Sequence, residues 1–186
     1  MILYFAPGSP FARILRILSR EHGLGLLEVE TPLRDPTAPQ LAHNPAGRVP
    51  ALLDGATLIC ETPLILAHLG LLPREAAALS RLGQAMALLD GIAVWNRDLR
   101  RPEQERSISF QALERSRANR ILDALDVAAH DPFSVEGIAL ACALGYCDRR
   151  HSVFQWREGR PKLAAWHAAI TSRPAFVETT PPLSGI

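Results

Sequence analysis

Two short segments of the sequence place polar side chains where a predicted helix begins. Ser9 precedes Pro10, which suits the first helical position because its missing N–H would lack an intrahelical partner there anyway. Glu61 and Thr62 precede Pro63 and a second apolar run in the same way. The free N–H groups and the dipole of a helix N-terminus favour an anion. Both segments could therefore hold anionic groups of a ligand, although each could also be a helix cap without a ligand.

A third segment, residues 44–52, reads NPAGRVPAL and puts a proline at the start of an apolar run. Proline cannot donate to a sheet ladder, so its place in a strand needs a reason. A cis bond between Val49 and Pro50 would turn the chain and leave the Val49 backbone N–H and C=O available to a partner. The local sequence alone also fits an ordinary X-Pro turn.

Hydrophobic periodicity predicts the elements that would position these segments. Short apolar runs predict strands at 1–5, 26–31, 49–53 and 57–59, with a hairpin at Asp54-Gly55. Helical spacing predicts helices at 10–22 and 61–69, and then only helices, at 76–100, 103–129, 134–149 and 161–172. We therefore expect two packed domains, an α/β unit at 1–71 and an all-helical bundle at 76–186, with a cleft where they meet.

The bulk composition argues against several classes of protein. The net charge of +1 gives no electrostatic reason to expect nucleic acid or an anionic membrane as a partner. Lys162 is the only lysine among the 20 basic residues, a skew that we attribute to genomic base composition rather than to phosphate binding. We expect neither an N-terminal targeting signal nor an apolar run long enough to span a bilayer.

The cysteines and histidines do not suggest a metal or redox centre. Cys60, Cys142 and Cys147 are odd in number and lack C-x-x-C spacing, so we expect no disulfide framework and a reducing, cytoplasmic location. The six histidines lack metal-ligand spacing, and we expect no metal.

Several motifs, taken in order, resemble the glutathione transferase superfamily. In the first half they are SPFAR at 9–13, NPAGRVPAL at 44–52 and ETP at 61–63. In the second half they are FSVEGIA at 133–139, PKLAAW at 161–166 and RPAF at 173–176. The resemblance covers essentially the whole chain, and the Ser-Pro-Phe start resembles a bacterial branch. It implies a thioredoxin-like N-terminal domain that binds glutathione as co-substrate, followed by a helical bundle that forms the acceptor side of the cleft.

The resemblance also implies roles for individual residues in binding glutathione. The Val49 backbone, beside a structural cis-proline at Pro50, would pair with the cysteinyl part of the tripeptide. Glu61 would take the ammonium, and Thr62 with the nearby helix amides would take the γ-glutamyl carboxylate, although the family usually has serine at the second position. Arg48 could reach the glycine carboxylate; as a lone loop arginine it would otherwise be a solvated charge.

The resemblance assigns both glutathione binding and catalysis to Ser9. The reaction needs a thiolate, whereas a free thiol is mostly protonated at neutral pH. A hydroxyl donor and a helix N-terminus aimed at the sulfur would lower its pKa. Ser9 could instead be only a helix cap. Tyr4, another hydroxyl, lies in a predicted strand and fits the core better. Relatives with cysteine in place of Ser9 carry out disulfide exchange, which serine does not support.

The sequence does not name the acceptor, for which we expect a small apolar electrophile. Trp95, Phe110, Tyr146 and Trp156 are candidates for an apolar acceptor pocket, although each could be core. The resemblance further implies a homodimer and a role in detoxification. Gly137 stands where the family has a capping acid, so the reciprocal bond of that capping box is lost. Two other functions stay open: a non-catalytic glutathione-binding or protein-interaction member of the fold, and a glutathione-dependent reductase or isomerase.

Overall fold

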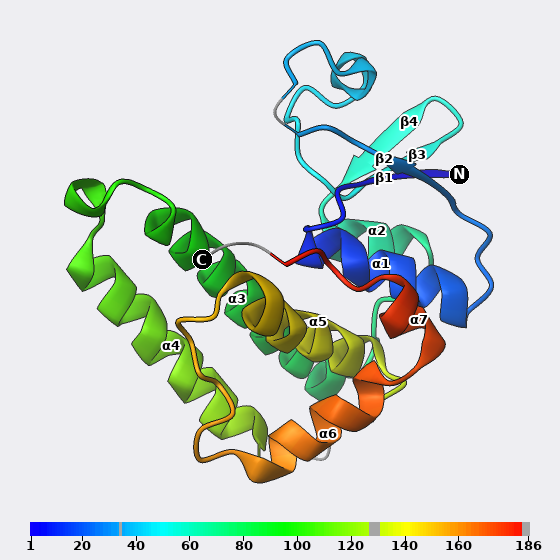
Figure 1. Cartoon of the computed structure of the whole chain (residues 1–186). Coiled ribbons are helices and arrows are strands. Elements are labelled where there is room, and N and C mark those ends of the chain that lie inside the picture. The colour runs from blue at the N-terminus through cyan, green and yellow to red at the C-terminus, as the bar shows by residue number, and fades with distance from the viewer. Residues whose placement is uncertain (34, 127–130, 184–186) are drawn as a thin grey trace.

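The computed structural model describes residues 1–33, 35–126 and 131–183, and it shows a small sheet covered on one side by helices, next to a helical bundle (Figure 1). The first part comprises β1 (Ile2–Phe5), α1 (Pro10–Glu21), β2 (Leu27–Glu30), β3 (Ala51–Asp54), β4 (Thr57–Cys60) and α2 (Thr62–His68). The second comprises α3 (Ala76–Leu99), α4 (Ile108–Asp126), α5 (Val135–Arg150), α6 (Pro161–Thr171) and α7 (Pro174–Glu178). The predicted fold class, a thioredoxin-like α/β unit followed by a helical bundle, is confirmed.

The sheet of the described residues runs in the order β2-β1-β3-β4. β1 lies parallel to β2 and antiparallel to β3, so the central strand links both halves of the sheet. The predicted hairpin joins β3 to β4, where Asp54 pairs with Thr57 around Gly55 at φ +58°. β3 begins at Ala51 rather than at the expected residue 49, because Pro50 has no N–H to donate to the ladder.

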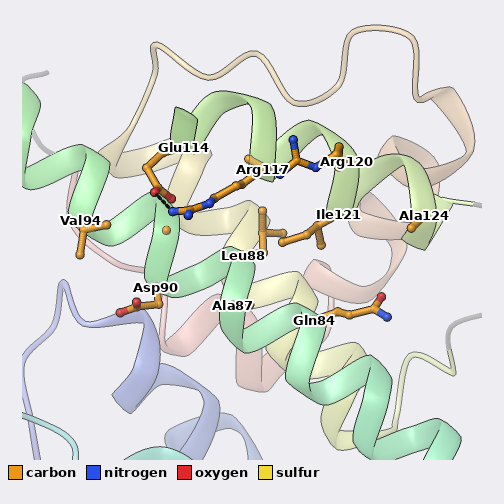
Figure 2. Close-up of a pocket in the computed structure, with 12 residues that line it drawn as sticks. Gln84, Ala87, Leu88, Asp90, Val94, Glu114, Arg117, Arg120, Ile121 and Ala124 are labelled. Carbon is orange, nitrogen blue, oxygen red and sulfur yellow. Dashed lines mark hydrogen bonds and ion pairs between the residues drawn. The ribbon is translucent and has the colours of Figure 1, made fainter. Parts of the chain in front are cut away.

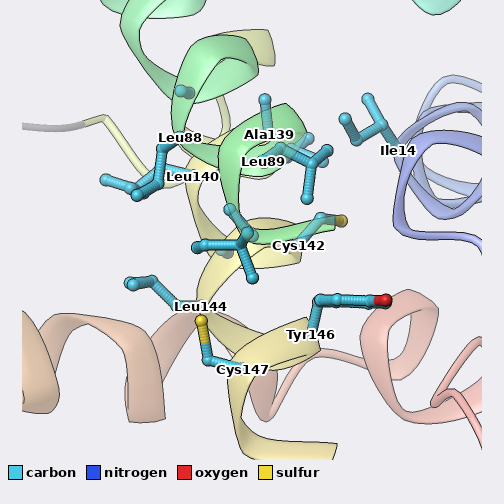
Figure 3. Close-up of a cluster of buried hydrophobic side chains, with 14 of the residues drawn as sticks. Ile14, Leu88, Leu89, Ala139, Leu140, Cys142, Leu144, Tyr146 and Cys147 are labelled. Atoms are coloured by element: carbon cyan, nitrogen blue, oxygen red, sulfur yellow. The ribbon is translucent and has the colours of Figure 1, made fainter. Parts of the chain in front are cut away.

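The two parts share one hydrophobic core. The side chains of α5 between Glu136 and Cys147 are all buried, which makes it the central helix of the molecule. Figure 3 shows the Ile14 side chain of α1 pointing toward Leu89 of α3 and Ala139 of α5, and all three belong to this core. Burial of this shared surface holds α1 against the bundle, and it therefore fixes the two walls of the cleft relative to each other.

Arg13 joins α1 to the C-terminal helices by hydrogen bonds. Its Nη2 donates to the Phe176 carbonyl at 2.9 Å, and its Nε donates to the Thr179 hydroxyl at 3.3 Å. A Cβ at Gly145 of α5 would come within 2.9 Å of Arg13 Nη1, so a larger residue there would force the guanidinium to shift. The second half of the SPFAR motif therefore serves the docking of the domains.

The helix expected at 103–129 differs from the structure. Residues Glu103–Glu105 form a separate 3-10 turn, and α4 begins only at Ile108. The reason lies in Ser107, whose hydroxyl accepts the Phe110 N–H at 3.3 Å and whose own N–H donates to Asp98 Oδ2 at 3.2 Å, so that it caps a new helix. The expected end of this helix, at 127–129, lies outside the described residues. The short α7, at 174–178, was not expected.

α3 also departs from an expectation, because by length and composition it could cross a membrane. Its 24 residues contain a window with a mean hydropathy of 1.2, so the expectation that no apolar run is long enough was wrong for this helix. In this structure α3 packs against both α4 and α5, with buried leucines along one side (Leu82, Leu88, Leu89 and Leu99). The absence of a membrane partner stays a prediction.

Candidate functional site

A cleft of about 590 Å³ opens where the thioredoxin-like part meets α3 and α5. One wall comes from the loop before α1, the loop before β3 and the start of α2, and it includes Ser9, Arg48, Val49 and Glu61. The three segments that carry these residues are separate in the sequence. They meet because β1 and β4 end, and β3 begins, at the same edge of the sheet. The cleft therefore brings together four of the five residues predicted to bind glutathione.

Ser9 is the N-cap of α1 and faces the cleft. Its Oγ accepts the Ala12 N–H at 3.2 Å, and its backbone is extended, as in a standard N-cap. That bond uses a lone pair of the hydroxyl oxygen, so the hydroxyl proton is still available. Among the described residues nothing accepts this proton. Ser9 can thus cap α1 and donate into the cleft at the same time.

The segment before β3 presents backbone groups of Val49 to the cleft. The Val49–Pro50 peptide bond is cis, and the ladder of β3 with β1 starts only at Ala51. The buried Asn44 side chain stabilises this loop, because its Nδ2 donates to the Arg48 carbonyl at 2.6 Å. In the described residues the Val49 N–H and C=O have no backbone partner, so an extended ligand could pair with them.

Glu61 adopts a strained backbone conformation at the edge of the cleft. Its φ of +70° is unusual for a residue with a side chain and costs about 1–3 kcal/mol. Its carboxylate is exposed and has no hydrogen-bond or ion-pair partner among the described residues. Strain of this kind clusters at binding sites, so the geometry favours a role for Glu61 in holding a cationic group.

Thr62 occupies a different place from the other predicted residues. Its side chain is only 1% exposed, and its hydroxyl donates to the Phe11 carbonyl at 3.2 Å. This bond ties the start of α2 to the start of α1, below the cleft rather than in its wall. The hydroxyl thus has a structural partner, while the first backbone amides of α2 still point out of the helix N-terminus.

The opposite wall comes from the bundle and is cationic rather than apolar. α3 contributes Arg97 and Arg100, and α5 contributes Tyr146 and Arg150. Of the four aromatic residues proposed for the acceptor pocket, only Tyr146 lines the cleft. Trp95 and Trp156 are fully buried in the core, and Phe110 lies on α4 outside the cleft.

Comparisons with known proteins agree with this geometry. The family model described as glutathione S-transferase, N-terminal domain, matches residues 3–76. An uncharacterized GST-like protein, YibF, of Escherichia coli strain K12 is 30% identical over 192 residues, which span 94% of this chain and 95% of that protein.

The chain belongs to the glutathione transferase family.

Solved structures of this family resemble the whole chain. A glutathione transferase family member from Pseudomonas fluorescens Pf-5, with bound glutathione, is 30% identical with a TM-score of 0.87, covering 98% of this chain and 99% of that one. A glutathione S-transferase from Methylobacterium radiotolerans JCM 2831, in complex with glutathione sulfonate, is 26% identical with a TM-score of 0.87, covering 100% of this chain and 96% of that one.

The cysteines of this chain are not poised for redox chemistry. Cys60 lines the cleft, but burial and the neighbouring Glu61 carboxylate raise the pKa of its thiol. Burial raises the pKa of Cys142 to about 11 and raises that of Cys147 as well. These thiols stay protonated at neutral pH, and a protonated thiol is a poor nucleophile. Within the described residues no three His, Cys, Asp or Glu side chains gather as a metal site would require.

A second hollow, of about 580 Å³, lies between α3 and α4 and holds none of the predicted site residues (Figure 2). Figure 2 shows the Glu114–Arg117 ion pair among the lining residues. The distance between Glu114 Oε1 and Arg117 Nη1 is 2.5 Å. A Cβ at Gly91 would come within 2.7 Å of Glu114 Oε2, so the glycine makes room for this carboxylate. The cleft at the domain junction is therefore the candidate site, because Ser9, Val49 and Glu61 meet there.

Sequence reasoning missed three residues of the cleft: Arg97, Arg100 and Arg150. A signal for them exists in the spacing. Ala93, Arg97 and Arg100 follow one another at helical intervals of four and three, and Tyr146 and Arg150 are four apart. Each set therefore lies on one helix face. The excess of arginine over the whole chain concealed these positions.

Proposed function

We propose that this protein is a glutathione transferase in which Ser9 activates the thiol of glutathione for attack on a small electrophile. The observation that carries the proposal is the Ser9 hydroxyl, which caps α1 through its lone pair and keeps its proton available at the cleft. Several neighbours of the fold support it, since their structures contain glutathione, including those from Pseudomonas fluorescens Pf-5 and Methylobacillus flagellatus KT.

In this proposal glutathione lies along the thioredoxin-like wall of the cleft. The backbone of Val49 pairs with the cysteinyl part, as an added strand would. Glu61 holds the ammonium of the γ-glutamyl group, the first amides of α2 at Thr62 hold its carboxylate, and Arg48 takes the glycine carboxylate. These contacts place the sulfur next to Ser9 at the N-terminus of α1.

The charge of the cleft favours the thiolate. Four arginines line it, against the carboxylates of Glu61 and Asp90, so the local potential is positive. The thiol releases its proton to solvent, and the sulfur then forms a bond to the electrophilic carbon. In a substitution the leaving group departs with its electron pair. In an addition the C=C electron pair moves to the neighbouring carbon, which takes up a proton.

The product of such an addition is bound by a related protein. A second structure of the Pseudomonas fluorescens Pf-5 family member, 28% identical to this chain with a TM-score of 0.85, contains S-(propanoic acid)-glutathione. The carboxylate of that conjugate is the reason to ask whether an acidic acceptor, rather than the apolar one first expected, fits the cleft of this chain.

Calorimetry with glutathione, together with a conjugation assay over a panel of electrophiles, tests the proposal. We expect binding in the millimolar range or tighter, turnover of at least one electrophile, and weaker binding in Glu61→Gln. Binding without turnover of any electrophile would instead support a non-catalytic member of the fold. Turnover of a peroxide or a cis-enone without conjugation would support a reductase or isomerase.

We also propose a cytoplasmic homodimer with a role in detoxification. The hollow between α3 and α4 supports the dimer, because it exposes apolar side chains of both helices between charged groups (Figure 2). Sedimentation at micromolar concentration tests this, and a monomer would count against it. Three free cysteines support the reducing compartment.

A further inference from the structure

Three arginines of the second wall have no acidic partner. Some other arginines pair with carboxylates, as Arg16 does with Glu28 and Arg173 with Glu21. In the part of the chain that the structure describes, no carboxylate oxygen lies within 4.0 Å of a guanidinium nitrogen of Arg97, Arg100 or Arg150. Three cations that line one cleft without a salt-bridge partner make it a place where an anionic ligand would be stabilised. We name these three residues the arginine cluster.

Arg150 lies directly beside the position proposed for the reacting sulfur. A Cβ at Gly8 would stand 3.0 Å from Arg150 Cζ and 3.1 Å from its Nη2, so the guanidinium packs on the backbone of the residue before Ser9. The Arg150 Nε is buried and has no hydrogen-bond partner among the described residues. Its Nη1 donates to the Pro182 carbonyl at a long 3.4 Å. Tyr146 is a further hydrogen-bond partner of the Arg150 side chain, so the donor left unused next to Ser9 is Nε.

A buried amide holds Arg100 and the end of α5 in place. Asn96 of α3 is 1% exposed, and its Nδ2 donates to the Arg150 carbonyl at the end of α5. Its Oδ1 accepts from Arg100 Nε at 2.8 Å. One side chain thus links the end of α5 to Arg100, so a buried amide holds the Arg100 guanidinium in place.

Tyr146 adds a neutral donor to the same wall. It lies one turn before Arg150 on α5, and its side chain is largely buried. Burial raises the pKa of its phenol, against the opposing effect of the nearby arginines, so the hydroxyl stays protonated at neutral pH. The wall therefore offers guanidinium forks and a phenolic O–H, which together suit the two oxygens of a carboxylate.

We propose that the arginine cluster binds a carboxylate of the acceptor, so that the preferred substrates are short electrophilic carboxylic acids. This rests on the proposed function, and it replaces the apolar electrophile expected from the sequence. An unsaturated acid illustrates the reaction. The sulfur bonds to the β-carbon, the C=C electron pair moves to the α-carbon, and that carbon takes up a proton equivalent to the one released by the thiol. The addition needs no oxidant or reductant.

Binding of two matched conjugates tests the proposal without any need for turnover. S-carboxyethyl glutathione and S-carbamoylethyl glutathione have the same shape and differ in one charge. By calorimetry we expect the carboxylate to bind at least about tenfold more tightly, equivalent to about 1.4 kcal/mol. The preference should shrink as ionic strength rises, because the charges are partly exposed to solvent.

Substitutions on the exposed face of α3 locate the effect. Arg97→Gln and Arg100→Gln should each reduce the preference for the carboxylate several-fold while leaving the affinity for glutathione itself within about twofold. Arg101→Gln is the matched control, since this exposed arginine follows the same helix but does not line the cleft. It should change neither value. Arg150→Gln should have the largest effect, because Arg150 is nearest to Ser9.

Three results would overturn the inference, and they are distinguishable. Equal affinity for the two conjugates would show that the cluster does not recognise a carboxylate. An equal loss of affinity for glutathione and for both conjugates in Arg100→Gln would assign the cluster to glutathione itself. Absence of binding by glutathione and by both conjugates would refute the proposed function and this inference with it. As an independent readout, a chloronitrobenzoate should be conjugated faster than the matching chloronitrobenzamide, mainly through a lower KM.

Discussion

Replacing Ser9 by alanine tests the activation of the thiol directly. The Ser9 hydroxyl accepts the Ala12 N–H at 3.2 Å and has a proton left to donate to a thiolate. A hydrogen bond to a charged acceptor contributes about 1.5–3 kcal/mol, which corresponds to about one to two pKa units. Because Ser9 is only half-buried, we expect the lower end of this range. The pKa of the bound glutathione thiol should therefore rise by about one unit in Ser9→Ala.

The assay is the ultraviolet absorbance of the thiolate in the glutathione complex, titrated against pH. Conjugation at neutral pH should slow by about tenfold, because about tenfold less of the bound thiol is ionised. The affinity for glutathione should stay within a few-fold, since the tripeptide is held mainly by groups other than Ser9.

Ser134→Ala provides a matched control for the loss of a helix cap. Ser134 caps α5 as Ser9 caps α1, with its Oγ accepting the Gly137 N–H at 3.0 Å, but it lies outside the cleft. Each substitution should cost about 1 kcal/mol of folding stability. Only Ser9→Ala should shift the thiolate titration. An unchanged titration in Ser9→Ala would refute the reasoning, leaving Ser9 as a helix cap and the backbone amides or the arginine cluster as the activating groups.

Three further predictions concern strain, docking and pH. Glu61→Gly should raise the free energy of unfolding by about 1 kcal/mol, because glycine adopts the positive φ without strain. It should also weaken glutathione binding. Urea unfolding and calorimetry measure the two effects, and a destabilised variant would contradict the assignment of strain. Arg13→Met should lower the free energy of unfolding by about 2–3 kcal/mol, since it removes a buried charged donor from both the Phe176 carbonyl and the Thr179 hydroxyl. An unchanged urea midpoint would argue against this anchor. Burial lowers the pKa of His151 to about 4 in the folded protein, below the ordinary value of 6.5 that applies to the unfolded chain. The unfolded chain therefore takes up this proton at a higher pH, so the free energy of unfolding should fall as the pH drops from 6.5 towards 4. His151→Phe, which keeps a ring against Trp95, should lessen that fall, and an identical loss of stability in both proteins would refute the role of His151.

Much of the site was predictable because its signals are local. A serine followed by proline predicts a helix cap from the chemistry of two adjacent residues, and Ser9 caps α1. Glu61 stands where the sequence places the start of α2. The cis bond at Val49–Pro50 followed from the family resemblance, since the local sequence also fitted an ordinary X-Pro turn. The order of the elements also followed from short-range periodicity, since a strand or helix pattern needs only its own residues.

Other features were decided by atoms distant in the sequence. Thr62 was expected to face a ligand, yet its hydroxyl bonds to Phe11, because the packing of α2 on α1 brings that carbonyl within 3.2 Å. The helix at 103–129 was expected to be continuous, but Asp98 at the end of α3 meets Ser107 and starts α4 there. In both cases the hydrogen-bond partner comes from another helix, so a pattern of neighbouring residues does not reveal it.

The positive charge of the cleft wall formed by α3 and α5 also depends on both local sequence and tertiary packing. Periodicity alone puts Arg97 and Arg100 on one face of a helix, and Arg150 on another helix, but it does not say that these faces meet. Only the packing of α3 and α5 around one core, joined at Asn96, brings the three cations beside Ser9 while it buries Trp95. Local sequence fixes which groups a segment can present, because propensity and capping act over a few residues. The partner that each group meets depends on how distant helices pack, because burial acts on the whole chain at once.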